Sequence, residues 1–129
     1  MGDSQMQVRQ LSIAEVEDWS QVGEGEIFVS DIIDAAGEPD AEMTVGFARI
    51  GRGEELEISF PYDEVLIVTK GAYTVRSSER GTITARAGEV IYLPADSENS
   101  SVAEEDTEMV YVAGPPAVYA RHVAASAAA

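Results

Sequence analysis

The chain has 129 residues, which predicts one domain with a substantial core, since chains of about 150 residues bury roughly 70% of their unfolded surface. Its 24 acidic and 8 basic residues give a net charge of -16, so its surface repels phosphate backbones and anionic lipid, and we expect no nucleic-acid partner. It contains no cysteine, which excludes disulfides and Cys-based zinc sites, and no apolar run of about 20 residues, so we expect no membrane partner and a cytoplasmic location.

Residues 1–24 are predicted to form an arm and one short helix. Ser12 is a suitable N-cap, Glu15 follows three residues later, and Ile13, Val16 and Trp19 recur at helical spacing. We expect Trp19 to pack in the core or at a dimer contact.

Two strands are predicted at residues 26–33 and 43–50, joined by a loop rich in Gly, Pro and Asp. In the second strand Arg49 shares a face with Val45 and Phe47. Arg49 is therefore a candidate for holding an anionic substrate inside a barrel. The alternative is an arginine at the strand edge, paired with one of the many carboxylates.

The centre of the chain repeats one pattern at residues 60–71 and 87–94. In each, an acidic residue leads into a continuous apolar run that ends at Gly or Pro, which is typical of a strand buried on both faces between two turns. Further strands are predicted at 72–77, 81–85 and 107–113, with a polar loop at 96–101. This succession of hairpins predicts an antiparallel barrel over residues 25–119. The C-terminal tail at 120–129 is expected to be a short helix or a frayed end.

The spacing of these motifs resembles the cupin superfamily. Glu64 precedes Gly71 by the cupin interval, and Gly88 and Pro94 fit the second cupin motif, in which Asn99 replaces the usual metal-binding histidine. The sequence of residues 62–65, 87–94 and 110–116 is most similar to the cupin domain of the EutQ ethanolamine-utilisation proteins, which also lacks those histidines. The resemblance covers residues 27–119. The resemblance implies an all-β, single-domain cupin, a double-stranded β-helix or jelly-roll barrel.

The strand at 55–60 decides the metal question, because its two faces differ in chemistry. If three residues separate the usual histidine positions from Glu64, these positions are Ile58 and Phe60, and the barrel mouth is apolar. If four residues separate them from Glu64, the usual histidine positions are Glu57 and Ser59. Together with Glu64 these would offer oxygen ligands to a hard cation such as magnesium or calcium. We favour the first alternative, which keeps the apolar face inside, and expect no cofactor.

Glu64 is the main catalytic candidate. Among apolar walls its carboxyl pKa rises towards neutrality, which suits a general acid or base. Tyr62 is a second catalytic candidate, as a proton donor. The substrate-binding candidates are Arg49, Ile58, Phe60, Tyr92, Asn99 and Tyr111. The competing interpretation is structural, with Glu64 bonded to backbone amides or an arginine and the tyrosines serving as packing.

Three functions follow from this sequence. The first is a metal-independent enzyme, an isomerase, cyclase or lyase, that acts on a small organic molecule by acid/base chemistry. The second is what the EutQ resemblance implies: a role in ethanolamine utilisation and bacterial microcompartments, with acetate kinase activity. The third is a non-catalytic cupin for ligand binding or assembly. By analogy with small cupins we also expect a homodimer, with His122 exposed or at the dimer contact.

Overall fold

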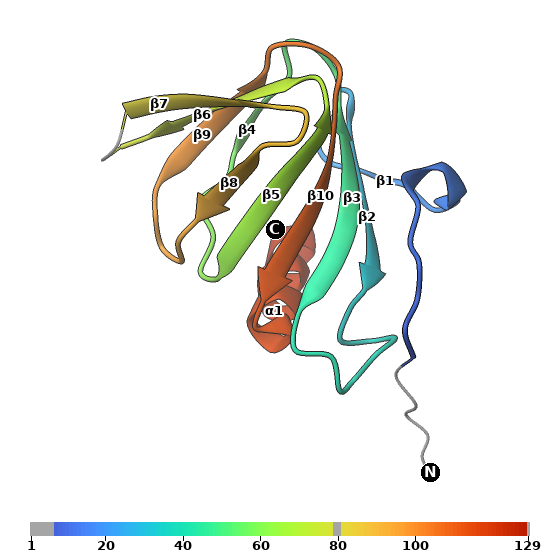
Figure 1. Ribbon diagram of the computed structural model, residues 1–129. Coiled ribbons are helices and arrows are strands. Elements are labelled where there is room, and N and C mark those ends of the chain that lie inside the picture. Colours follow the sequence, from blue (N-terminus) through green and yellow to red (C-terminus); the bar gives the residue numbers. More distant parts are fainter. Residues whose placement is uncertain (1–6, 79–80, 129) are drawn as a thin grey trace.

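The computed structural model describes residues 7–78 and 81–128, and two antiparallel sheets form a barrel within it (Figure 1). The six-stranded sheet has the order β1-β2-β3-β10-β5-β8, and the four-stranded sheet has the order β4-β9-β6-β7. The strands of the larger sheet are β1 (Ser20–Gln21), β2 (Ile27–Ile33), β3 (Thr44–Ile50), β5 (Asp63–Lys70), β8 (Val90–Leu93) and β10 (Thr107–Gly114). Those of the smaller sheet are β4 (Glu55–Glu57), β6 (Ala72–Ser77), β7 (Gly81–Arg86) and β9 (Asn99–Ala103).

Alternation along the strands places one set of side chains between the sheets. On β5 the buried residues are Glu64, Leu66 and Val68, and on β10 Met109 and Tyr111 are buried opposite them. The period of two that defines strands therefore sorts the predicted apolar runs into an inner and an outer face. The all-β barrel predicted from the sequence is confirmed.

The N-terminal helix is shorter than predicted. Only Ile13–Glu15 form a single 3-10 turn, capped by Ser12, whose Oγ accepts a hydrogen bond from the Ala14 amide at 3.3 Å. Val16 already has extended backbone angles, so the helical spacing up to Trp19 does not correspond to a longer helix. The prediction of Ser12 as the N-cap is confirmed, and the predicted length of the helix is wrong.

Strand β9 begins in the middle of the segment 96–101, which the sequence predicts as a polar loop. Its residues Asn99–Ala103 pair with both β4 and β6, so tertiary pairing fixes an extended chain where intrinsic strand preference is weak. Side chains reinforce the pairing, because Ser101 Oγ donates to the Leu56 carbonyl at 3.1 Å.

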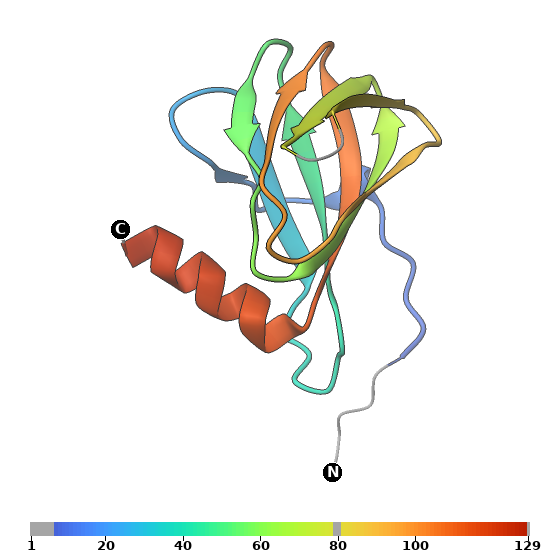
Figure 2. The same ribbon diagram turned by 90° about the vertical axis from the view of Figure 1, so that its left-hand side faces the viewer.

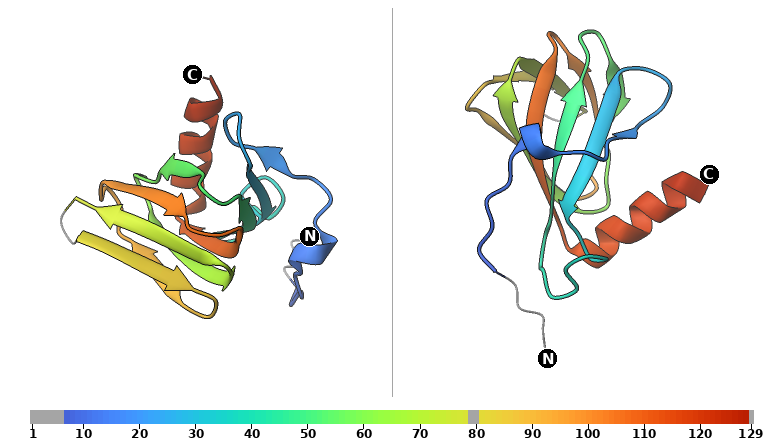
Figure 3. Two further views of the ribbon diagram at one scale, coloured as in Figure 1. Left: turned by 90° about the horizontal axis from the view of Figure 1, so that it is seen from above. Right: turned by 90° about the vertical axis from the view of Figure 1, so that its right-hand side faces the viewer.

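The C-terminal end forms helix α1 (Pro116–Ala128), the first of the two alternatives left open by the sequence, and the helix begins before residue 120. Pro116 is well suited to a first helical turn, where its missing N–H costs no hydrogen bond. Figures 2 and 3 show α1 leaving the barrel at the end where β10 finishes, with its later turns directed away from the sheets. No helix in the described part of the chain is long and apolar enough to span a bilayer.

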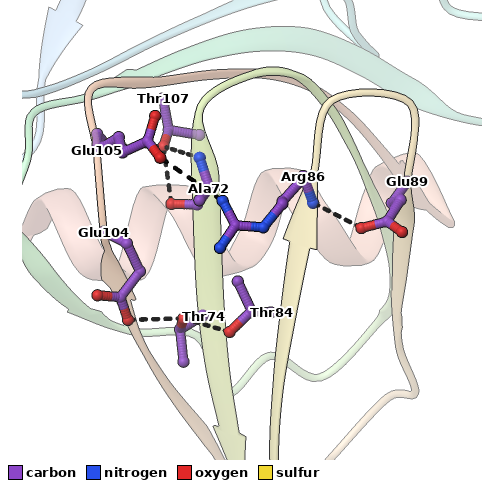
Figure 4. A network of polar contacts seen from close by, with 8 residues as sticks. All are labelled: Ala72, Thr74, Thr84, Arg86, Glu89, Glu104, Glu105 and Thr107. Atoms are coloured by element: carbon purple, nitrogen blue, oxygen red, sulfur yellow. Dashed lines mark hydrogen bonds and ion pairs between the residues drawn. The ribbon is translucent and has the colours of Figure 1, made fainter.

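A polar network stabilises the opposite end of β10 (Figure 4). Thr107 Oγ1 donates to the Ala72 carbonyl at 3.1 Å and accepts from the Ala72 amide at 3.3 Å. Nearby, Thr74 Oγ1 donates to Glu104 at 2.7 Å. The β5–β6 turn that brings these strands together depends on Gly71, whose φ of 91° favours glycine and where a Cβ would lie 2.4 Å from the Asp106 carbonyl oxygen.

Candidate active site

Glu64 lies inside the barrel on β5, where only 6% of its surface is exposed. It faces the apolar core between Ala113 on β10 and Leu93 on β8, its two partners in the strand register. None of the residues that the structure describes forms a hydrogen bond with its carboxyl group. Burial, and then the charge of Asp31, raise its pKa to about 8. The carboxyl is therefore protonated at neutral pH and close to titration.

Asp31 on β2 receives hydrogen bonds from two tyrosines, of which Tyr111 is buried and Tyr119 is half-buried. Tyr111 donates to its Oδ1 at 2.6 Å and Tyr119 of α1 donates to the same oxygen at 2.7 Å. Gly46 lies between Asp31 and Tyr111 in the register, and a Cβ there would be 2.3 Å from the Tyr111 ring. The absent side chain on β3 is therefore what lets the Tyr111 phenol reach across to β2.

Four rings cover this end of the barrel, and we call them the aromatic cluster: Phe60, Tyr62, Tyr119 and His122. The first two stack in parallel with their centroids 5.1 Å apart. His122 meets both edge-on, at 5.5 and 5.7 Å, and Tyr119 meets Tyr62 edge-on at 5.3 Å. Tyr119 and His122 of α1 thus contact Tyr62, which lies close to Glu64, and His122 is a half-buried member of the aromatic cluster.

The tyrosines around the two acids remain protonated. Burial raises the pKa of Tyr62 well above its usual range, and the charges of Glu64 and Asp31 raise it further. Burial likewise raises the pKa of Tyr111 and Tyr119, with Asp31 adding to both. Tyr73, which bonds to Ser101, has a pKa raised to about 12, again mainly by burial. These phenols can donate hydrogen bonds but do not titrate near neutrality.

Thr44 adds an unpaired hydroxyl to the inner face. It is fully buried on β3, and its Oγ1 has no hydrogen-bond partner in the described part of the chain. In the register Thr44 pairs with Ala113, which in turn pairs with Glu64. Only a methyl side chain therefore separates the position of Thr44 from that of Glu64 across three strands.

The strand at 55–60 has the orientation that we favoured from the sequence. Ile58 is 4% exposed in the core and Phe60 packs against it, whereas Glu57 and Ser59 are exposed. The alternative hard-cation set is consequently not assembled, because Glu64 points inward and the other two residues outward. Within residues 7–78 and 81–128 no group of three or more His, Cys, Asp or Glu side chains is arranged to hold a metal ion.

Two substrate-binding candidates, Asn99 and Tyr92, make contacts away from Glu64. Asn99 is buried, but its Nδ2 donates to Ser97 Oγ at 2.8 Å and to the Ile58 carbonyl at 3.4 Å, so it ties β9 to the segment after β4. Tyr92 is 59% exposed on the outer face of β8, where its hydroxyl lies 3.5 Å from Asp63. Neither side chain reaches Glu64.

Arg49 lies on the outer face of the larger sheet, as in the alternative interpretation. Its Nε is 3.2 Å from Glu108, and its guanidinium carbon lies 4.7 Å from the centroid of the Trp19 ring. Arg49, Trp19 and Glu108 line a groove of about 500 Å³ on that outer face.

The structure thus brings together five of the candidate residues: Glu64, Tyr62, Phe60, Ile58 and Tyr111. It separates Arg49, Tyr92 and Asn99 from them.

Sequence reasoning missed Asp31, Thr44 and Tyr119. Asp31 is one acid among 24 in a strand that otherwise reads as apolar. Tyr119 and His122 were assigned to the end of the barrel and a tail. The available signal was the helical spacing of the two aromatic residues after the prolines at 115 and 116, which would have placed both rings on one face.

Two antiparallel sheets around one core, with a C-terminal helix at one end, define a small single-domain cupin barrel. The RmlC-like cupin from Shewanella frigidimarina is similar in structure, with a TM-score of 0.67 and 14% identity over 84% of this chain and 92% of that chain. Ectoine synthase from P. lautus is similar as well, with a TM-score of 0.71 and 18% identity over 86% of this chain and 79% of that chain. Both likenesses concern the fold alone.

Residues 9–120 match the family described as Ethanolamine utilisation protein EutQ, and the chain belongs to this family. The putative ethanolamine utilization protein Q from Salmonella typhimurium is 26% identical over 70% of each chain, with a TM-score of 0.63. A search of curated proteins returned no match. The resemblance seen in residues 62–65, 87–94 and 110–116 is thereby confirmed at the level of the family.

Proposed function

We propose that this EutQ-family protein is a metal-independent enzyme that acts on a small organic molecule by acid/base chemistry, of isomerase, cyclase or lyase type. The observation that carries the proposal is Glu64: a carboxyl group inside the barrel, unbonded to the described residues, with a pKa of about 8. General acids and bases work best when their pKa lies near the working pH. Ectoine synthase, which has the same fold, is by its name an enzyme.

The roles of the neighbouring residues follow from their chemistry. Protonated Glu64 donates a proton to a basic atom of the substrate, and its carboxylate form removes one from an acidic C–H or O–H group. Tyr62, kept neutral by burial, donates a hydrogen bond to the developing negative charge. Ile58 and Phe60 form apolar walls, which keep the dielectric constant low around the reacting groups. No metal or other cofactor has a role in this proposal.

A substrate reaches Glu64 through the aromatic cluster. The rings of Tyr119 and His122 lie against Tyr62 and Phe60, so the proposal requires that α1 or these side chains move when a substrate enters. Beyond these rings, α1 is largely exposed, which makes such a movement inexpensive.

Hydrogen exchange from solvent tests the proposal without a known substrate. Small ketones, hydroxy acids and amino alcohols are incubated in D2O with the protein, and deuterium incorporation is followed by NMR. The native chain should accelerate exchange in at least one compound, and Glu64→Gln should lower that rate by about 10²-fold to 10⁴-fold. Glu57→Gln, on the exposed face, is the matched control and should have no effect. No exchange above the buffer rate, or equal rates with Glu64→Gln, would contradict a catalytic role.

A second candidate function is a role in ethanolamine utilisation without catalysis in this barrel, as a ligand-binding or assembly protein. Family membership supports the pathway, and the closed aromatic cluster supports a barrel that binds without turnover. This candidate predicts ligand binding that depends on Glu64 with no deuterium exchange in any compound.

We also propose that the chain forms a homodimer through the outer face of the larger sheet. Two apolar rows lie there, one of Val110, Ile67 and Val90 and beside it one of Val45, Val112, Val65 and Tyr92. A second copy, equally acidic, can approach most easily where charge is absent. Lys70 and Asp63 lie at opposite ends of β5, so a two-fold axis would bring unlike charges together.

A further inference from the structure

Among the described residues, two acidic side chains lie in the barrel interior, and neither forms an ion pair with a lysine or an arginine. Asp31 and Glu64 both face this interior, and the charge of the first raises the pKa of the second. The described arginines in ion pairs are bound elsewhere: Arg9 to Glu38, Arg49 to Glu108 and Arg86 to Glu105. An uncompensated negative charge in a medium of low dielectric constant is costly, and a bound cation would remove that cost.

Several polar atoms around the two acids are also unpaired among the described residues. Glu64 makes no hydrogen bond, although it is 94% buried, since 6% of its surface is exposed. The Thr44 hydroxyl is fully buried and has no partner. Both tyrosine bonds to Asp31 go to Oδ1, so its Oδ2 is bonded to no described residue. Buried polar groups are usually paired, so the fully buried Thr44 hydroxyl and the unbonded carboxyl of Glu64, in one region with the partly exposed Asp31, indicate a site for a ligand.

The surroundings favour an organic cation over a metal ion. Within the described residues no group of three or more His, Cys, Asp or Glu side chains is arranged to hold a metal ion. The walls are rings instead: Tyr62 and Phe60 lie beside Glu64, with Tyr119 and His122 against them. Aromatic rings next to carboxylates are the usual recognition surface for alkylammonium groups, through cation–π attraction.

We propose that Asp31, Glu64 and Thr44, together with the aromatic cluster, form a binding site for a small organic ammonium ion. The ammonium N–H groups donate to the carboxylate of Glu64, to Oδ2 of Asp31 and to the Thr44 hydroxyl, and the carbon atoms contact the rings. This inference rests on the proposed function, because it names the substrate class of the same site.

Binding of the cation is coupled to the loss of one proton. The titratable groups that interact with the charge of Glu64 are Asp31 on β2, Tyr62 before β5 and Tyr73 on β6. Around these lie Tyr111 on β10 and Tyr119 on α1, which donate hydrogen bonds to Asp31, and His122 on α1, which contacts Tyr62. Burial keeps the four phenols neutral. Glu64 is protonated before binding and ionised in the complex, so its proton passes to the solvent as the ammonium ion enters. Affinity should therefore rise with pH below the Glu64 pKa of about 8.

The test is an NMR titration of the full chain with three probes of similar size: ethylammonium, ethanol and acetate. Ethylammonium should shift the amide signals of β2, β5 and α1, and its affinity should increase about eightfold between about pH 6.5 and about pH 7.5, because only the ionised form of Glu64 binds it. Ethanol and acetate should bind at least about tenfold more weakly, since each lacks the charge that the two acids attract.

Two substitutions and one control make the result specific. Glu64→Gln should weaken ethylammonium binding and abolish its pH dependence. Thr44→Val, which keeps the shape, should weaken binding at both pH values while the pH dependence stays. Glu57→Gln, an exposed acid, should change neither. The inference would be overturned if ethylammonium did not bind, if its affinity did not depend on pH, or if Glu64→Gln left its affinity unchanged. Binding of ethanol or acetate with equal affinity would also overturn it.

The outcomes also separate this inference from the proposed function. If acetate or ethanol binds in place of ethylammonium and deuterium exchange still depends on Glu64, the ammonium site is refuted and acid/base catalysis stands. If ethylammonium binds as expected but no exchange is catalysed, the catalytic proposal is refuted and the ammonium site stands.

Discussion

Replacing Glu64 with Gln should stabilise the protein near neutral pH, although the residue lies in the core. In the unfolded chain the carboxyl has its ordinary pKa of 4.5, and in the fold it has a pKa of about 8. The protonated carboxyl contributes fully to stability below pH 4.5. This contribution is lost as the pH rises from 4.5 through the folded pKa, because the carboxyl of the unfolded chain releases its proton at a lower pH than that of the folded chain. Glutamine has nearly the same shape and no proton to lose.

The size of the effect follows from the two pKa values. Between them, the free energy of unfolding of the native chain should fall, relative to that of Glu64→Gln, by about 1.4 kcal/mol for each pH unit. At pH 7 the accumulated difference is about 3 kcal/mol. Since Glu64 is 94% buried, given its exposure of 6%, solvent screening does not reduce this figure strongly.

Urea unfolding of both chains at a series of pH values between about 4.5 and about 8 measures this difference directly. The amide of the substituted side chain shifts the whole curve by a constant amount, so the slope of the difference is the quantity that matters. Glu57→Gln is the control, and its curve should run parallel to that of the native chain. Parallel curves for Glu64→Gln as well would refute the raised pKa and, with it, the interior position of the carboxyl.

Three further predictions concern the surroundings of the site and the dimer. Gly46→Ala should destabilise the fold by about 1–3 kcal/mol in urea unfolding, because its Cβ would lie 2.3 Å from the Tyr111 ring, and an unchanged midpoint would contradict this contact. Tyr119→Phe removes a hydrogen bond to Asp31, so amide exchange in α1 should accelerate about tenfold with the barrel unaffected, and uniform acceleration would argue against a local role. Ile67→Asp on the outer face should convert a dimer to a monomer in light scattering, and a native chain that is already monomeric would refute the interface.

Much of the fold could be predicted because its strands carry strong patterns. The continuous apolar run after Glu64 predicts a strand, which is confirmed, but it predicts burial on both faces, whereas only alternate residues are buried; Gly71 ends the strand with a positive φ. The choice of Ile58 and Phe60 as the inward pair could be made from the apolar alternation alone. Strand β9 could not, because its small polar residues are held extended by neighbours that are remote in the sequence.

The candidate site could be predicted only in part, for a related reason. Glu64 stands out as an acid at the start of an apolar strand. Asp31 becomes significant only through Gly46 and Tyr111, which the register of three strands brings together. The contribution of α1 depends on how a helix folds back on the barrel, and no local pattern specifies that direction.

The place of β10 in the larger sheet affects how the protein folds during synthesis. This strand lies between β3 and β5, yet residues 107–114 are the last strand to leave the ribosome. Until they emerge, β3 and β5 each expose an unpaired edge, and such edges promote aggregation of nascent chains. Closure of the sheet is therefore a late, long-range event, and we expect protein shortened within β10 to accumulate as insoluble material rather than as a smaller barrel.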